Sequence, residues 1–233
     1  MSIGNLKCIS CFAEVSCVYT RYTDEILKME RCSTCGNLAD KYAEYDFFII
    51  VVDLIVLRIE AYRHLIRNYA YDSWLKLLFL SLILNSFVSW LDEKPVSGID
   101  LSNLSMYFKS DLCVHILASL SWCIFFISIF YLQCFLLRLK VSLANLLKIL
   151  VLVNMSRVMS FFILPWKSLF ESIYGELPFY LTVYTVLGFL TCTQSLRALT
   201  NCSSIISILI SGVSCFCAFF SFIAVTSISE YIT

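Results

Sequence analysis

The chain has few charged residues for its length. Of 233 residues, 15% are charged and 60% are hydrophobic, and the mean hydropathy is +0.83. Soluble globular proteins are about 45–50% apolar and about 25% charged. The shortage of charge therefore excludes a soluble globular protein and predicts an integral membrane protein. Seventeen basic residues balance seventeen acidic ones, so we expect no nucleic acid among the partners.

Sequence motifs of common enzymes are also missing. The chain has no GxSxG, no HExxH and no phosphate-binding loop, and its only histidines are His64 and His115. We therefore expect no catalytic residues and no enzymatic activity, which disfavours a membrane acyltransferase. No basic segment followed by an apolar one occurs near residue 1, so we expect no cleaved signal peptide and a cytosolic N-terminus.

The polar N-terminal part contains a metal-type cysteine pattern. Cys8 and Cys11 are followed after twenty residues by Cys32 and Cys35, which gives C-x2-C-x20-C-x2-C. Four thiolates satisfy a tetrahedral zinc ion, and cytosolic thiols stay reduced. A redox couple and a chance pattern are the alternatives, and the ribbon-like spacing argues against both. We predict a zinc ribbon over residues 1–45, with hairpin strands at 15–19 and 26–30, a turn at 23–25, and a positive-φ turn at Gly36.

Residues 46–70 are apolar but interrupted by charge. In a helix, Asp46, Asp53, Glu60 and Arg67 recur every seven residues and form one polar stripe. The apolar run is short for a spanning helix, which needs about 20 residues. We therefore predict an amphipathic helix in the headgroup plane that presents the segment 62–64 to phosphates or to a partner. The alternative is a first transmembrane span with a buried Asp53.

Residues 71–233 have the composition of a helical membrane domain. Their apolar runs predict about five spans, at 75–91, 112–137, 146–166, 178–196 and 203–227. The third span contains Asn154 and Arg157, and an intramembrane arginine indicates a functional residue unless it snorkels or bonds backbone carbonyls. Basic residues in the 138–148 loop and acidic ones in the 92–111 loop favour a cytosolic N-terminus.

The first quarter of the chain resembles a known family. The cysteine pairs, the sequences ADKY at 39–42 and EYD at 44–46, the apolar run at 49–57 and the sequence AYRHLIRN at 61–68 carry the resemblance. Together they are similar to the homology domain of the Arv family (ACAT-related proteins required for viability). The resemblance implies a multi-pass protein of the endoplasmic reticulum membrane, with the Golgi membrane as a second location.

The resemblance also implies a function in intracellular lipid distribution. Family members are connected with sterol transport, sphingolipid metabolism and the supply of glycosylphosphatidylinositol (GPI) anchor intermediates. Sterols, sphingolipids and GPI precursors are the expected partners, with GPI- or lipid-synthesis enzymes as further partners. A lipid transporter and a zinc-ribbon scaffold for such enzymes both remain open. The residues predicted to contact lipid or a partner are Asp53, Tyr62, Arg63, His64, Asn154 and Arg157.

Overall fold

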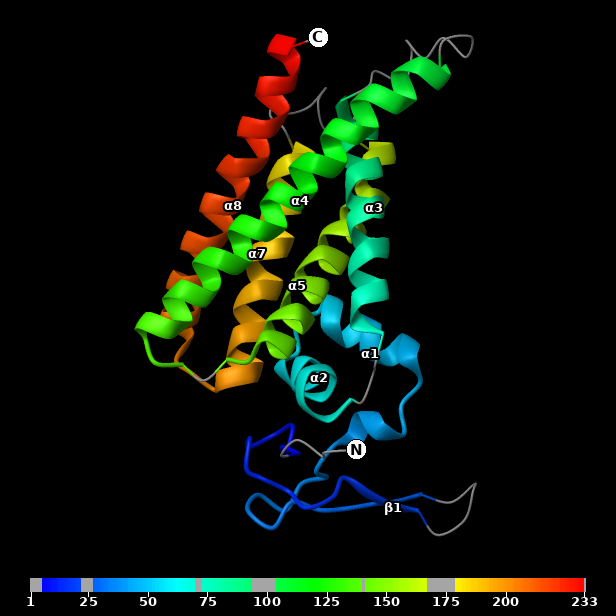
Figure 1. Ribbon diagram of the computed structural model, residues 1–233. Coiled ribbons are helices and arrows are strands. Elements are labelled where there is room, and N and C mark those ends of the chain that lie inside the picture. The colour runs from blue at the N-terminus through cyan, green and yellow to red at the C-terminus, as the bar shows by residue number, and fades with distance from the viewer. Residues whose placement is uncertain are drawn as a thin grey trace. The chain divides into compact units, whose positions relative to one another are not determined.

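The computed structural model of the chain describes residues 6–21, 27–69, 73–93, 104–139, 141–166 and 179–232 (Figure 1). The chain divides into two compact units. One comprises Met1–Asp72 and Thr193–Ser207, and the other comprises Ser73–Cys192 and Ile208–Thr233. The polar head therefore includes a segment from far along the chain, which composition did not indicate.

The first unit contains the predicted hairpin. Strand β1 (Tyr19–Arg21) pairs antiparallel with β2 (Leu27–Met29), with Tyr19 opposite Met29. Strand β2 lies within the predicted 26–30, but β1 shares only Tyr19 with the predicted 15–19. Residues before β1 belong to the first cysteine turn instead, where Lys7 bridges Glu14 and the N–H of Val15 donates to Leu6. The predicted turn at 23–25 lies outside the described residues.

The segment after the hairpin is not one continuous helix, so that prediction was wrong. It consists of the 3-10 turn η1 (Lys41–Ala43), helices α1 (Phe47–Ile55) and α2 (Ile59–Arg63), and the π-helical turn η2 (His64–Asn68). Leu57, two residues after the end of α1, has a φ of 61°, and the hydroxyl of Tyr62 donates to the carbonyl of Leu54 across the break, at 3.0 Å. No glycine or proline marks this break in the sequence.

Helix α1 is too short to cross a bilayer. Its nine residues extend about 14 Å, whereas the hydrocarbon core is about 30 Å thick. The alternative of a first transmembrane span at this position therefore disagrees with the helix length.

The second unit is helical. Its elements are α3 (Trp74–Glu93), α4 (Leu104–Leu136), α5 (Leu143–Val158), the 3-10 run η4 (Met159–Trp166), and most of α7 (Phe179–Thr200) and α8 (Ser204–Ile232). Helix α3 packs against both α4 and α5 (Figure 1). The hydroxyl of Ser214 on α8 donates to Gln133 on α4 at 3.4 Å, which joins α8 to the same bundle.

Three described helices are long and apolar enough to cross a membrane: Trp74–Leu91, Leu112–Leu136 and Ser204–Ser227. They coincide with three of the five predicted spans. Helix α5 is only 16 residues long before η4 begins, and α7 carries Gln194 and Arg197 in its last two turns. Five spans are therefore not confirmed. Most of the 92–111 loop and the 167–177 loop, used for the orientation, lies outside the described residues.

Candidate metal centre and its supporting network

The two CxxC motifs fold into matching turns. In the first, the N–H of Cys8 donates to Ala13 and the N–H of Phe12 donates to Cys8. In the second, the N–H of Cys32 donates to the carbonyl of Asn37 and the N–H of Gly36 donates to the carbonyl of Cys32. Donor and acceptor are the same number of residues apart in both turns. The residue after the second cysteine has a positive φ in both turns, 67° at Phe12 and 72° at Gly36. The predicted positive-φ turn at Gly36 is thus confirmed, and we refer to the two turns as the first and second knuckles.

The four cysteine sulfurs converge on one point. All four Sγ atoms lie within 4.8 Å of one another, with Cys8–Cys35 at 3.8 Å and Cys11–Cys32 at 3.6 Å. A tetrahedral zinc ion with Zn–S bonds of about 2.3 Å needs sulfurs about 3.8 Å apart. A disulfide needs about 2.05 Å, so the four cysteines are free thiols. The donor set and its spacing therefore fit a metal ion of the zinc type.

The thiols differ in their readiness to ionise. Burial raises the pKa of Cys8 to about 12. At Cys32, hydrogen bonds from the backbone N–H groups of Cys35 and Thr34 lower the pKa to about 6. A metal ion binds all four as thiolates, so its binding releases protons.

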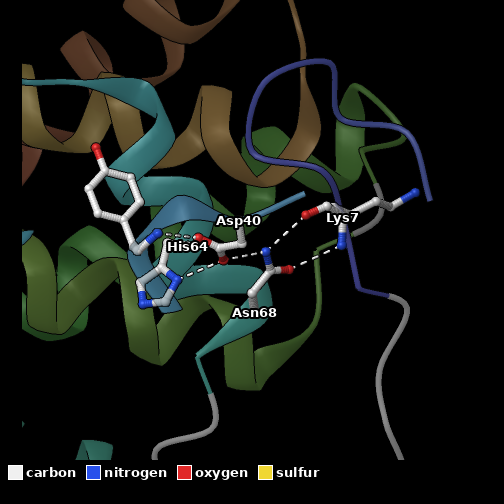
Figure 2. A network of polar contacts seen from close by, with 5 residues as sticks. Lys7, Asp40, His64 and Asn68 are labelled. Carbon is white, nitrogen blue, oxygen red and sulfur yellow. Dashed lines mark hydrogen bonds and ion pairs between the residues drawn. The ribbon is translucent and has the colours of Figure 1, made fainter. Parts of the chain in front are cut away.

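A buried carboxylate connects the knuckles to the helical part of the first unit. Asp40 is fully buried and accepts hydrogen bonds from the backbone N–H of Tyr42 at 3.0 Å and from the amide of Asn68 at 2.7 Å. The Nδ1 atom of His64 lies 2.7 Å from the same carboxylate. Asn68 also exchanges two hydrogen bonds with the backbone of Lys7, at 3.0 and 2.9 Å (Figure 2). This network fixes residues 64–68 against the start of the first knuckle.

Asp53 faces the protein interior. The hydroxyl of Tyr42 donates to its carboxylate at 2.6 Å, and Arg58 lies 3.5 Å away on the other oxygen. The predicted polar stripe therefore does not present Asp53 to headgroups, because η1 supplies a buried hydrogen-bond donor to it. Burial and the bond to Asp53 raise the pKa of Tyr42, which keeps the phenol protonated.

Arg63 and His64 are also buried, so the prediction that they are presented at the surface was wrong. Arg63 donates to the carbonyls of Ile9 and Ser10, both at 2.7 Å, and to the side chain of Asn201 at 2.9 Å. These partners are distant in sequence, which local periodicity cannot detect. For Asp53, Tyr62, Arg63 and His64, contact with lipid or a partner stays a prediction.

The outward side of α1 is apolar instead. Phe47, Phe48 and Val56 have exposed fractions of 68%, 75% and 63%, and Ile49, Val52 and Ile55 are also exposed. The inward side carries Ile50 and Asp53. Tertiary hydrogen bonding has therefore placed the acid inside and left the large apolar side chains outside.

The two polar residues predicted within the third span occupy the core of the helical unit. The amide of Asn85 donates to the backbone and side-chain oxygens of Asn154, at 3.1 and 3.2 Å. The guanidinium of Arg157 lies between two rings, 3.9 Å from the centroid of Trp122 and 3.6 Å from that of Tyr184. Arg157 does not snorkel to an interface, because cation–π contacts hold it inside the unit.

Several supporting residues were not predicted as site residues. Asp40 and Asn68 lie within the segments that carry the family resemblance, whereas Phe12 and Asn201 lie outside them. One signal in the sequence precedes each cysteine pair: a basic residue, Lys7 or Arg31, stands directly before it. This repeated basic residue indicates two equivalent knuckles, but it does not identify the residues that pack against them.

The fold and the site define a helical membrane protein whose polar head brings four cysteines together as one metal-type ligand set. The chain belongs to the Arv1-like family, whose model matches residues 7–225. It is 32% identical over 127 residues to Protein ARV1 of Bos taurus, covering 53% of this chain and 45% of that one. It is 33% identical over 84 residues to Protein ARV1 of Homo sapiens, covering 36% of this chain and 31% of that one. It is 41% identical over 66 residues to Protein arv1 of Schizosaccharomyces pombe, covering 27% of this chain and 24% of that one.

The matched segments thus cover less than half the length of these relatives. No solved structure matches this chain.

Proposed function

We propose that this chain is a protein of the endoplasmic reticulum membrane, with a cytosolic N-terminus, that functions in lipid homeostasis without enzymatic activity. In this proposal it mediates sterol transport and distribution, and thereby affects sphingolipid metabolism and the supply of GPI-anchor intermediates. The Golgi membrane is a second location. The four cysteines bind zinc, and membrane lipids are the direct partners.

The observation that carries the proposal is the outward apolar side of α1. Large apolar side chains are exposed there, as on a surface that contacts lipid: Phe47, Phe48, Ile55 and Val56. The one acid of α1, Asp53, accepts a hydrogen bond from Tyr42 in the interior instead. A helix of this length lies within one leaflet and does not span.

The metal centre supports the same surface through a chain of contacts. The N–H of Ile9 in the first knuckle donates to the carbonyl of Ala39 at 3.0 Å, next to Asp40. Asp40 accepts from the backbone of Tyr42, whose hydroxyl in turn holds Asp53 on α1. Zinc would stabilise the knuckles, and these contacts then fix which side of α1 faces outward.

Reconstitution tests the proposal. Purified protein in liposomes is expected to accelerate the transfer of labelled sterol or labelled GPI precursor between leaflets or vesicles. Phe48→Glu places a charge on the outward side of α1 and should reduce this acceleration. The control Leu38→Glu changes a residue that is also exposed but lies in the ribbon, and should leave it unchanged. If the wild-type protein moves neither lipid, the scaffold function replaces the transport function.

A further inference from the structure

Arg63 connects two parts of the first unit that are far apart in sequence. Its Nη1 atom donates to the carbonyls of Ile9 and Ser10, which lie between the first two cysteines, at 2.7 Å each. Its Nη2 atom donates to the side chain of Asn201 at 2.9 Å. One planar guanidinium thus bonds the first knuckle and the connection between α7 and α8. That connection comprises residues 201–203, directly before the candidate span Ser204–Ser227.

A second arginine makes a parallel link. Arg67 donates to the backbone carbonyl of Leu199, one of the last carbonyls of α7. The guanidinium groups of Arg63 and Arg67 lie 5.3 and 5.7 Å from the ring centroid of Phe12. Phe12 is the residue after Cys11 that holds the positive φ of the first knuckle. Both links therefore start from the same cysteine turn.

The charges in this region explain why two arginines are tolerated there. Desolvation lowers the pKa of both the buried Arg63 and the half-buried Arg67, so each cation has an energetic cost there. A zinc ion with four thiolates carries a formal charge of about −2. The carbonyl end of α7 is the negative end of a helix dipole. With metal bound, both cations would thus lie between two sources of negative potential.

We propose that Arg63 and Arg67 are positioning residues through which the metal centre keeps the α7–α8 connection in a fixed conformation. This inference rests on the proposed metal binding and does not require lipid transport. Without metal, the first knuckle loses the constraint that fixes the carbonyls of Ile9 and Ser10. Arg63 then loses two of its three acceptors, and its hold on Asn201 weakens. The state of the cysteines is thereby transmitted to the residues at which a membrane helix begins.

Hydrogen exchange of the full-length protein in nanodiscs tests this dependence. The backbone of residues 197–207 is compared in metal-loaded protein and after treatment with a strong chelator. We expect exchange in this peptide to accelerate roughly ten- to hundredfold, the range for losing a hydrogen bond to a charged group. Residues 212–222 of α8 serve as an internal control and should keep their protection. Unchanged exchange in 197–207 after metal removal would overturn the proposal, as would wild-type protein that contains no metal.

Substitutions at Asn201 test whether the hydrogen bond from Arg63 to Asn201 carries the metal response, rather than a general loss of stability in the first unit. Asn201 has a φ of 54°, which glycine adopts without strain, so Asn201→Gly removes the acceptor and keeps the backbone conformation. Asn201→Asp keeps an acceptor for Arg63. Both variants should bind metal like wild type. The metal response of residues 197–207 should be largely lost in Asn201→Gly and kept in Asn201→Asp.

Arginine-to-lysine changes provide a matched pair. Lysine cannot reach three acceptors with one planar group, so Arg63→Lys should weaken the metal response of residues 197–207. Arg58→Lys changes a half-exposed arginine whose ion-pair partner is Asp53, and should preserve that response. An equal response in Asn201→Gly and wild type, or equal effects of the two lysine variants, would contradict the assigned role of Arg63.

Discussion

Replacing Asp40 with Ala should have the largest effect of any single non-cysteine change in the head. Asp40 is fully buried and receives the backbone N–H of Tyr42 and the side chains of His64 and Asn68. The alanine variant removes this acceptor from the buried N–H of Tyr42, the buried ring of His64 and the part-buried amide of Asn68. Each costs about 1–3 kcal/mol when left unsatisfied.

We therefore expect Asp40→Ala to lower the free energy of unfolding of the first unit by about 3–5 kcal/mol. A unit of this size has only a few kcal/mol of stability apart from a bound metal. The variant should therefore release zinc at a lower temperature and exchange amide protons rapidly over residues 61–68. Metal release during heating, followed with a chromogenic chelator, measures the first effect.

Glu44→Ala is the matched control, because Glu44 is an exposed acid in the same motif. It should change the release temperature little. If Asp40→Ala and Glu44→Ala release zinc at the same temperature, the network around Asp40 does not support the knuckles and the reasoning is wrong.

Three further changes test other parts of the structure. Gly36→Ala should destabilise the second knuckle by about 1 kcal/mol, since φ is 72° although the added Cβ has free space; an unchanged zinc-release temperature would contradict this. Tyr42→Phe should reduce the alkaline loss of stability. Burial raises the pKa of Tyr42, so the neutral phenol contributes fully below about pH 10 and less above it. The free energy of unfolding measured in urea should therefore fall more between about pH 8 and pH 11 in wild type than in the variant, and an equal fall in both would contradict this. Gly188→Ala should cost the helical unit roughly 1–3 kcal/mol, because its Cβ would lie 3.3 Å from Arg157, whereas Gly212→Ala, with nothing closer than 3.8 Å, should unfold at the wild-type temperature.

The local features of the head could be predicted from the sequence. A CxxC turn is defined by four consecutive residues, so the spacing of Cys8, Cys11, Cys32 and Cys35 predicted the ligand set that the structure brings together. The hairpin and three candidate spans were predicted for the same reason, since each is encoded by a short or strongly apolar segment. Five spans were not confirmed, because α5 ends after 16 residues.

Features that depend on distant contacts could not be predicted. A seven-residue repeat of charge places Asp53 on one side of a helix, but it does not say whether that side faces water or a buried hydroxyl. Arg63 has its acceptors at residues 9, 10 and 201, and His64 has its partner at residue 40. The break at Leu57 has no glycine or proline to signal it, and the N–H of Arg58 donates to the carbonyl of Asp53 across the turn with the positive φ.

Metal analysis of the purified full-length protein tests the central claim most directly. Protein prepared without chelator is expected to contain one zinc ion per chain. Cys32→Ser should lose it, because the variant leaves three of the four sulfurs that lie within 4.8 Å of one another. Cys17→Ser should keep it, because Cys17 is exposed and outside the ligand set. Wild-type protein without zinc, or equal zinc in both variants, would contradict the account.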